Sequence, residues 1–259
     1  MRDRPEHRRR ELLYGRHAVH ESLQAQRRQH YKLILATGIR QTAAIDQICT
    51  LAQQAGLPVH QAPRQQLDQL GDVNHQGVAL EAEEYPYASL NNILEIAQTR
   101  DEPPLLLLLD LLQDPQNVGS ILRTAEAVGV HGAVIQRRRA VGITPAVVHA
   151  SAGAVEHLPV AQVTNLSNTI RQLKEEHVWI AGLEAVPQAL WYDQVRLDGP
   201  LAIVLGSEGR GLRRLVRERC DFLLQLPMCG RVTSLNASVA ASVVLYQVLR
   251  QRRADPADR

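Results

Sequence analysis

Three short polar clusters each follow an apolar, strand-like run in the second half of the chain. They are Asp114–Asn117 after PLLLLLDLL, Gly206–Gly211 after LAIVL, and Thr233, Ser234 and Asn236 after DFLLQLPM. In a parallel sheet the carboxyl ends of the strands share one edge, and ligands bind beyond that edge. Amide, hydroxyl and carboxylate groups gathered there can hold a polar ligand and orient a reacting group. The clusters therefore predict a site at the carboxyl edge of a sheet.

Each cluster also has a purely structural interpretation. Asn117 could cap the helix after the Asp114-Pro115 turn, and Ser234 or Asn236 could cap the last helix. Arg123 and Glu126 stand three residues apart, so they could form a surface ion pair. The glycines of residues 206–211 fit a tight turn. This stretch matches neither GxxxxGK[ST] nor GxGxxG, which disfavours a nucleoside triphosphate site.

Alternating strand and helix patterns must position these clusters. Residues 104–253 predict a mostly parallel sheet, with strands over 104–112, 132–136, 158–163, 178–185, 201–208 and 221–228 and helices over 117–129, 144–155, 166–177 and 237–253. Residues 11–85 predict a smaller α/β domain, with strands over 31–37, 57–63 and 77–85 and helices from Arg16 and over 42–56. Residues 86–103 contain a short helix and a Pro-containing break, which predicts a linker.

Composition limits the class of protein. The 259 residues are 45% hydrophobic and 22% charged, enough for a folded core, and the net charge is only +2. Only Lys32 and Lys174 among the 29 basic residues are lysines. The planar fork of arginine suits phosphate, although genomic base composition also favours Arg over Lys. Basic clusters at 2–10, 137–139 and 250–253 could hold a nucleic-acid backbone. Residues 1–10 predict a disordered basic lead, which could equally be a solvated tail.

Other classes are disfavoured. With one Phe, two Trp and six Tyr, a module that stacks RNA bases on a sheet of aromatic residues is not expected. The cysteines Cys49, Cys220 and Cys229 predict neither a disulfide framework nor a nucleophile, and no metal-ligand cluster is visible. The charged N-terminus lacks an apolar signal region, and the longest apolar run, 105–112, is broken by Asp110 and is too short to span a bilayer. We therefore expect a cytoplasmic protein without a membrane partner.

Taken together, NVGSILRTAEAVGV, LGSEGRGL and LPMCGRVTSLNASVAASVVLYQVLRQR closely resemble the three motifs of the SpoU (TrmH) family of SPOUT RNA 2′-O-methyltransferases. The order and spacing of the motifs also fit. LLYGRHAVHESL resembles the start of the small L30e-like RNA-binding domain that precedes the catalytic domain in the RlmB group of 23S ribosomal RNA guanosine 2′-O-methyltransferases. The resemblance covers most of residues 104–253 and, less specifically, the N-terminal domain.

The resemblance implies an α/β fold with a C-terminal, trefoil-knotted SPOUT domain over 104–255, preceded by an L30e-like domain over 11–85. It implies methyl transfer from S-adenosyl-L-methionine to a ribose 2′-hydroxyl, without a metal, by a homodimer whose active sites use both chains. The catalytic residues implied by motif position are Asn117, Arg123, Glu208, Ser234 and Asn236. The cofactor-binding residues so implied are Leu183, Glu184, Gly206, Leu226, Ser234 and Leu235.

Within this resemblance, Arg123 would stabilise the developing alkoxide and Asn117 would orient Arg123 or the substrate. A guanosine of large-subunit ribosomal RNA is the leading substrate, and a transfer RNA ribose is the alternative. A non-catalytic RNA-binding assembly factor is a third hypothesis. Loss of Arg123 or Asn236 would have favoured that third hypothesis, and both are present.

Overall fold

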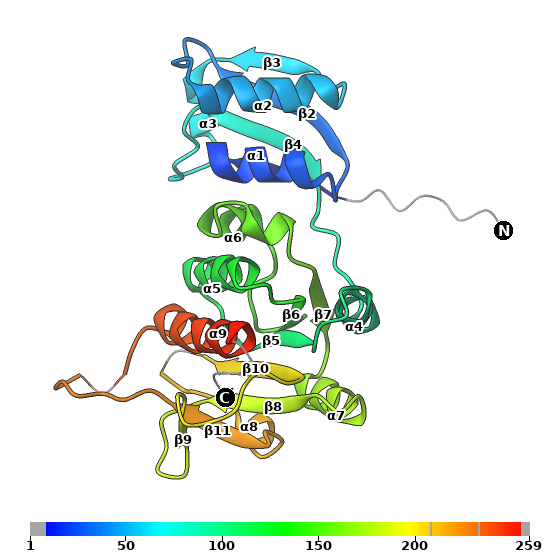
Figure 1. Cartoon of the computed structure of the whole chain (residues 1–259). Coiled ribbons are helices and arrows are strands. Elements are labelled where there is room, and N and C mark those ends of the chain that lie inside the picture. The colour runs from blue at the N-terminus through cyan, green and yellow to red at the C-terminus, as the bar shows by residue number, and fades with distance from the viewer. Residues whose placement is uncertain (1–8, 208, 233, 255–259) are drawn as a thin grey trace. The chain divides into compact units, whose positions relative to one another are not determined.

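The computed structural model describes residues 9–207, 209–232 and 234–254, so the predicted site residue Glu208, together with Thr233 and most of the basic lead, lies outside the described residues. The chain divides into two compact units. The first contains residues up to Pro86 together with Ile143–His157, and the second contains Tyr87–Gly142 and the residues from Leu158 onward. Figure 1 shows the elements of each unit along the chain.

The first unit is built on a four-stranded mixed sheet. Its strand order is β1 (Arg10–Tyr14), β4 (Val78–Glu83), β2 (His30–Ala36) and β3 (Val59–Ala62). β4 is antiparallel to both β1 and β2, whereas β2 and β3 are parallel. The helices are α1 (Arg16–Ala25), α2 (Ala43–Gln54) and α3 (Arg64–Asp68). β2, β3, β4, α1 and α2 lie where the sequence pattern places them.

Local signals explain where the helices of the first unit begin. Gly15 has a φ of 88°, which lets the chain turn directly from β1 into α1. The Thr42 side chain accepts a hydrogen bond from the Ile45 amide and caps α2. The apolar faces of α1 and α2 supply Leu23, Ile45 and other fully buried side chains to the core.

The segment Ile143–His157 packs with the first unit, although sequence order places it in the second domain. Thr144 caps α6 (Pro145–Ala150), as predicted, but the single helix predicted over 144–155 ends early. Ala152 and Gly153 take positive φ values of 52° and 86°, and the 3-10 helix η1 (Ala154–Glu156) follows. A Cβ at Gly153 would contact the Glu21 side chain on α1, so this close approach requires glycine.

The second unit contains a seven-stranded parallel sheet, which confirms the mostly parallel sheet predicted from the sequence. The strand order is β7 (Val160–Val163), β6 (Gly132–Gln136), β5 (Leu105–Asp110), β10 (Leu201–Gly206), β8 (Trp179–Leu183), β11 (Phe222–Gln225) and β9 (Leu190–Trp191). The two-residue edge strand β9 was not predicted. β5 and β10 lie in the middle of the sheet and are buried on both faces, which explains their continuous apolar runs.

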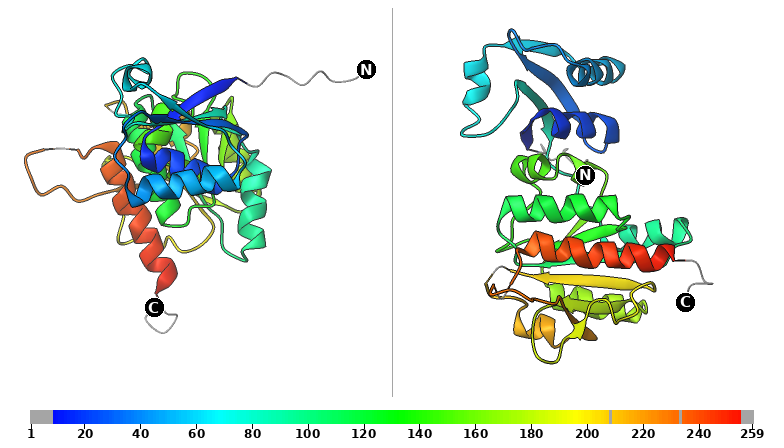
Figure 2. Two further views of the ribbon diagram at one scale, coloured as in Figure 1. Left: turned by 90° about the horizontal axis from the view of Figure 1, so that it is seen from above. Right: turned by 60° about the vertical axis from the view of Figure 1, so that its left-hand side comes forward.

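Helices cover both faces of this sheet (Figures 1 and 2). One face packs Leu106 and Leu108 of β5 against α4 (Leu90–Thr99), α7 (Leu166–Glu175) and α8 (Arg214–Arg217). Alternate strand residues point to the other face, where α5 (Pro115–Ala127) and α9 (Ala237–Arg253) lie side by side. α4 falls in the predicted linker, and its Ile93 is fully buried in the core of this unit.

Candidate active site

The three polar clusters lie at one edge of the parallel sheet. β5, β10, β8 and β11 are consecutive neighbours, so their carboxyl ends share that edge. The register pairs Gly206 with Asp110, the last residues of β10 and β5. The sequence-based prediction of a site at the carboxyl edge therefore has the strand arrangement that it needs.

The first and third clusters are joined by a hydrogen bond. The Asn236 side-chain amide donates to Asn117 Oδ1 over 2.8 Å, across 119 positions of sequence. Asn236 also caps α9, because its Oδ1 accepts from the amides of Ser238 and Val239. Asn236 is thus the cap of α9, as the structural interpretation predicted, and its amide also binds the side chain of Asn117.

The cap of α5 differs from the prediction for Asn117. Asp114 is the N-cap, since its carboxylate accepts from the amides of Gln116 and Asn117, and Pro115 occupies the first helical position. Asn117 therefore lies within the first turn, which leaves its side chain available to Asn236. A cavity of about 200 Å³ adjoins this turn, lined by Leu111, Leu112, Gln113, Asp114, Asn117 and Ser207.

Arg123 is exposed on α5, six residues beyond Asn117. Six residues correspond to about 9 Å along a helix axis. Within the described residues no ion pair joins Arg123 to Glu126, so the surface pair considered from sequence is absent there. α5 is held beside α9 by a hydrogen bond of 2.9 Å between Thr124 and Ser242. The structure therefore joins Asn117 with Asn236, and it leaves the Arg123 guanidinium open to a ligand.

The second cluster forms a closed turn that requires its glycines. The Gly211 amide donates to the Ser207 carbonyl over 2.9 Å. A Cβ at Gly206 would overlap the backbone of Gly211, and Gly211 itself has a φ of 63° and abuts the Glu184 carboxylate. Such close backbone approach excludes any larger residue.

The predicted cofactor residues Leu183, Leu226, Ser234 and Leu235 lie at or after strand ends of the same sheet. Leu183 ends β8, Leu226 follows β11, and both are half-buried, while Leu235 is 44% exposed in the loop before α9. Ser234 is exposed in the same loop. The partly exposed leucines could cover a flat heterocycle, and the strand-end backbone could bind its polar edge. This mixture of apolar surface and backbone groups suits a nucleoside such as that of S-adenosylmethionine.

Two carboxylates at this edge have partners that the sequence did not indicate. Asp110, which was not predicted as a site residue, accepts hydrogen bonds from Arg213. Glu184, which the resemblance assigned to the cofactor, is paired through its side chain with Arg217, and this pairing raises the pKa of Arg217. In each case the arginine is distant in sequence from the carboxylate that it binds. Burial raises the pKa of the Cys220 thiol to about 12, which leaves this cysteine protonated and unsuited to act as a nucleophile.

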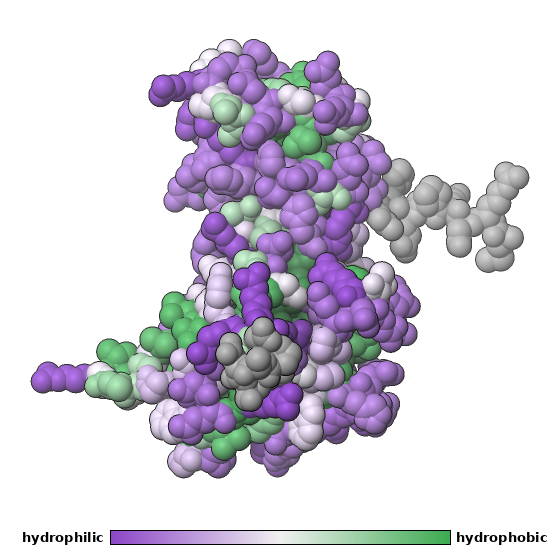
Figure 3. Space-filling model, in the orientation of Figure 1, coloured by the Kyte–Doolittle hydropathy of each residue, from purple (hydrophilic) through white to green (hydrophobic). Residues whose placement is uncertain are grey.

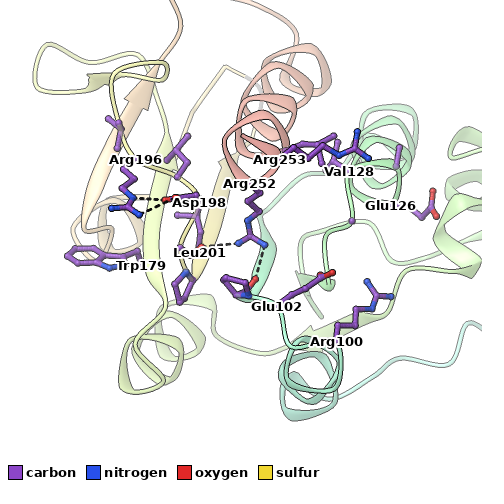
Figure 4. Close-up of a pocket in the computed structure, with 18 of the residues that line it drawn as sticks. Arg100, Glu102, Glu126, Val128, Trp179, Arg196, Asp198, Leu201, Arg252 and Arg253 are labelled. Atoms are coloured by element: carbon purple, nitrogen blue, oxygen red, sulfur yellow. Dashed lines mark hydrogen bonds and ion pairs between the residues drawn. The ribbon is translucent and has the colours of Figure 1, made fainter. Parts of the chain in front are cut away.

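A larger hollow of about 1140 Å³ lies at the opposite, amino edge of the sheet (Figure 4). Trp179, Leu201 and Phe222, each the first residue of its strand, line it. There the Arg252 guanidinium donates to the carbonyls of Pro103 and Gly199. Glu126 and Arg252 line this hollow, but the predicted site residues Asn117, Arg123, Ser234 and Asn236 do not, so the larger volume does not mark the candidate active site. Among the described residues no cluster of metal-ligating side chains occurs, and no helix is long and apolar enough to cross a membrane.

Comparisons with known proteins agree with the motifs. Residues 104–246 match the SpoU rRNA methylase family, and residues 12–88 match the RNA 2′-O ribose methyltransferase substrate-binding domain. The chain is 47% identical over 244 residues to a putative TrmH family tRNA/rRNA methyltransferase, YacO, of Bacillus subtilis, with 93% of this chain and 96% of the relative covered.

Solved structures share the fold. The SpoU methyltransferase AviRb from Streptomyces viridochromogenes, in complex with AdoMet, has a TM-score of 0.77 at 23% identity and covers 94% of this chain and 90% of its own. An AdoMet-bound rRNA methyltransferase from Sinorhizobium meliloti has a TM-score of 0.76 at 22% identity, and the match covers 95% of this chain and 89% of the other. A TrmH/SpoU tRNA modifying enzyme from A. aeolicus, with a TM-score of 0.53 at 24% identity, covers 63% of this chain and 85% of its own. The family matches and the similarity to the Bacillus subtilis relative agree with the three motifs read from the sequence. The chain belongs to the SpoU (TrmH) family of SPOUT RNA 2′-O-methyltransferases, which use S-adenosylmethionine as the methyl donor.

Proposed function

We propose that this enzyme methylates the ribose 2′-hydroxyl of a guanosine in large-subunit ribosomal RNA. The observation that carries the proposal is the substrate-binding unit that precedes the methylase unit. The neighbour described as an rRNA methyltransferase matches 95% of this chain, whereas the one described as a tRNA modifying enzyme matches 63%. The extra unit is what a large, structured ribosomal RNA substrate would need for its recognition. Transfer RNA remains the alternative substrate within the same chemistry.

The reaction needs alignment more than activation. Bound S-adenosylmethionine supplies a methyl group on a sulfonium, which is already a good leaving group. The residues of the chain must bring the 2′-oxygen into line with the methyl carbon and stabilise the oxygen as it loses its proton. Arginine keeps its proton up to a pKa above about 12, so Arg123 cannot serve as the base at neutral pH. We assign Arg123 to the developing alkoxide, which its exposed guanidinium on α5 can reach.

The other motif residues take supporting roles in this proposal. Asn117, fixed by its hydrogen bond to Asn236, would orient the substrate or Arg123. Asn236 and Ser234 would hold the loop before α9 around the cofactor, and Glu208 would act on the substrate side. The backbone near Gly206 and the leucines at 183, 226 and 235 would bind the cofactor.

We also propose that the enzyme works as a homodimer with a knotted catalytic domain. Apolar side chains gather on the surface of the loop after β11 and along α9 (Figure 3). Val239, Val243 and Tyr246, spaced four and three residues apart, are 49%, 37% and 55% exposed along one side of α9. A second copy that covers this stripe would lie beside Arg123 and could complete the site. The position of β8 between β10 and β11 requires the chain to cross β8 twice, which supports the proposed knot. We place the enzyme in the cytoplasm, where its three free cysteines would remain reduced.

The test is methyl transfer from labelled S-adenosylmethionine to unmodified ribosomal RNA and, separately, to bulk transfer RNA. The products are then mapped for 2′-O-methylated nucleosides. Label at one guanosine of the large-subunit RNA supports the proposal. Label confined to transfer RNA overturns the substrate and keeps the chemistry.

A further inference from the structure

The glycine-rich turn at residues 206–213 is flanked by two carboxylates, one from each strand beside β10. Asp110 ends β5 and is the register partner of Gly206. Glu184 follows β8, whose Leu183 pairs with Leu205 on the other side of β10. The turn therefore leaves the sheet between two acidic side chains.

Asp110 binds the end of the turn. Its side chain is fully buried, and a buried carboxylate is stable only when its oxygens are hydrogen-bonded to partners. Arg213 supplies them: its backbone amide donates to Oδ2 over 2.9 Å, and its Nε donates to Oδ1 over 2.7 Å. Arg213 is thus held through both its main chain and its side chain. The first residue of the turn, Gly206, and its last residue, Arg213, therefore both lie beside Asp110.

Glu184 binds the preceding residue from the opposite side. Its Oε1 accepts from the Leu212 amide over 3.3 Å and from the Arg217 guanidinium over 2.7 Å. A Cβ at Gly211 would overlap the same oxygen, so only glycine fits at this position. The two carboxylates therefore accept the amides of consecutive residues, Leu212 and Arg213.

We infer that Asp110 and Glu184, with Arg213 and Arg217, form a clamp that positions the 206–213 turn for the cofactor. The inference rests on the proposed role of Gly206 as a cofactor contact. A turn with three glycines in six residues has many accessible conformations when free. The contacts of Asp110 and Glu184 with Arg213 and Leu212, at the end of the turn, restrict the turn to one conformation. In this conformation the Gly206 backbone faces the nucleoside, and Ser207 lines the cavity beside Asn117. These four are positioning residues, since they act through the turn.

The test compares Arg213→Ala and Asp110→Asn with the control Arg196→Ala, which removes an exposed ion pair to Asp198 far from the turn in sequence. Arg213→Ala is the primary variant because this side chain is 46% exposed, and because the backbone amide at position 213 can still donate to the buried Asp110 carboxylate after the change. Amide hydrogen exchange of the ligand-free protein reports whether residues 212 and 213 are released. Isothermal titration with S-adenosylhomocysteine then reports whether the cofactor site is weakened.

We expect faster exchange at both amides and an affinity about tenfold lower in Arg213→Ala, as the loss of one charge-assisted hydrogen bond produces. KM for S-adenosylmethionine should rise more than kcat falls, and Arg213→Lys should restore part of the affinity. Unchanged exchange would overturn the clamp, and faster exchange with affinity within about twofold of the wild type would overturn its role toward the cofactor. The hydrogen exchange and the titration with S-adenosylhomocysteine contain no RNA, so a failure of the proposed ribosomal substrate would leave these two results interpretable.

Discussion

Removing one partner of the buried ion pair between Arg28 and Glu156 should strongly destabilise the first unit. Both side chains have no exposed surface, and Arg28 donates to the two Glu156 oxygens over 2.6 and 3.2 Å. Arg28 also donates to the Glu83 carbonyl and Ser22 donates to Glu156, so the pair lies within a larger network. Glu156→Ala would leave the guanidinium buried without its main counter-ion.

The expected loss is about 3–5 kcal/mol of unfolding free energy, the cost of removing one partner from a buried pair. Removing both charges should cost less, because desolvation opposes the pair. In agreement with this, burial raises the pKa of Glu156 although Arg28 lies beside it. We therefore expect the double variant Arg28→Met/Glu156→Leu to be more stable than Glu156→Ala alone.

Urea denaturation followed by far-UV circular dichroism measures these free energies in the full chain. Arg10→Ala is the matched control, because it breaks the pair of Arg10 with Glu81 in the same unit while the Arg10 side chain is 57% exposed. That control should have an unfolding free energy close to that of the wild type, because an exposed ion pair contributes little. A loss below about 1 kcal/mol for Glu156→Ala would refute the reasoning, because the buried charge would then have found water or another partner.

Further predictions concern the site, the interface and pH. Arg123→Ala should abolish methyl transfer while S-adenosylhomocysteine still binds by calorimetry; unchanged turnover would contradict its assigned role. Asn236→Ala should lower the unfolding free energy by about 1 kcal/mol through loss of the α9 cap and should also reduce kcat, whereas an unaltered kcat would reduce Asn236 to a cap. Tyr246→Asp should shift the enzyme to a monomer in sedimentation and lower its activity, and a dimer that persists would place the interface elsewhere. Burial, and to a smaller extent the charge of Arg28, lowers the pKa of His30 from 6.5 to about 4 in the folded protein. The neutral imidazole therefore contributes stability above pH 6.5, and this stability should be lost as the pH falls toward 4. His30→Gln should flatten this part of the pH profile, and equal slopes for the two proteins would contradict it.

The sequence predicted the elements whose signals are local. The parallel sheet of the second unit, the helix pattern that starts at Thr42 and the start of α6 at Thr144 all follow from apolar periodicity and from residues within one helical turn. The cap of α5 was assigned wrongly, because both Asp114 and Asn117 are good capping residues and sequence alone does not show that Pro115 already occupies the first turn.

Contacts between distant residues were beyond sequence reading. Asp110 reads as a break in an apolar run, and nothing near it indicates that Arg213 will bind it from 103 positions away. The same limit hid the packing of Ile143–His157 with the first unit, which depends on Arg28 meeting Glu156. In each case the sequence shows a charged residue near the end of an element, but it does not show which distant residue will bind that charge.

The opposite edges of the second sheet show why strand direction locates the site better than volume. The hollow at the amino edge is the larger, yet its arginine at 252 is already bonded to carbonyls of the chain. At the carboxyl edge the hollow is small, but four neighbouring strands end there and their loops carry Asn117, Gly206 and Asn236. Because parallel strands deliver their loops to one edge, residues that are distant in sequence converge there without a deep cavity. A ligand at that edge would be enclosed by the loops themselves, which is why the positions of the 206–213 turn and of the loop before α9 should control its affinity.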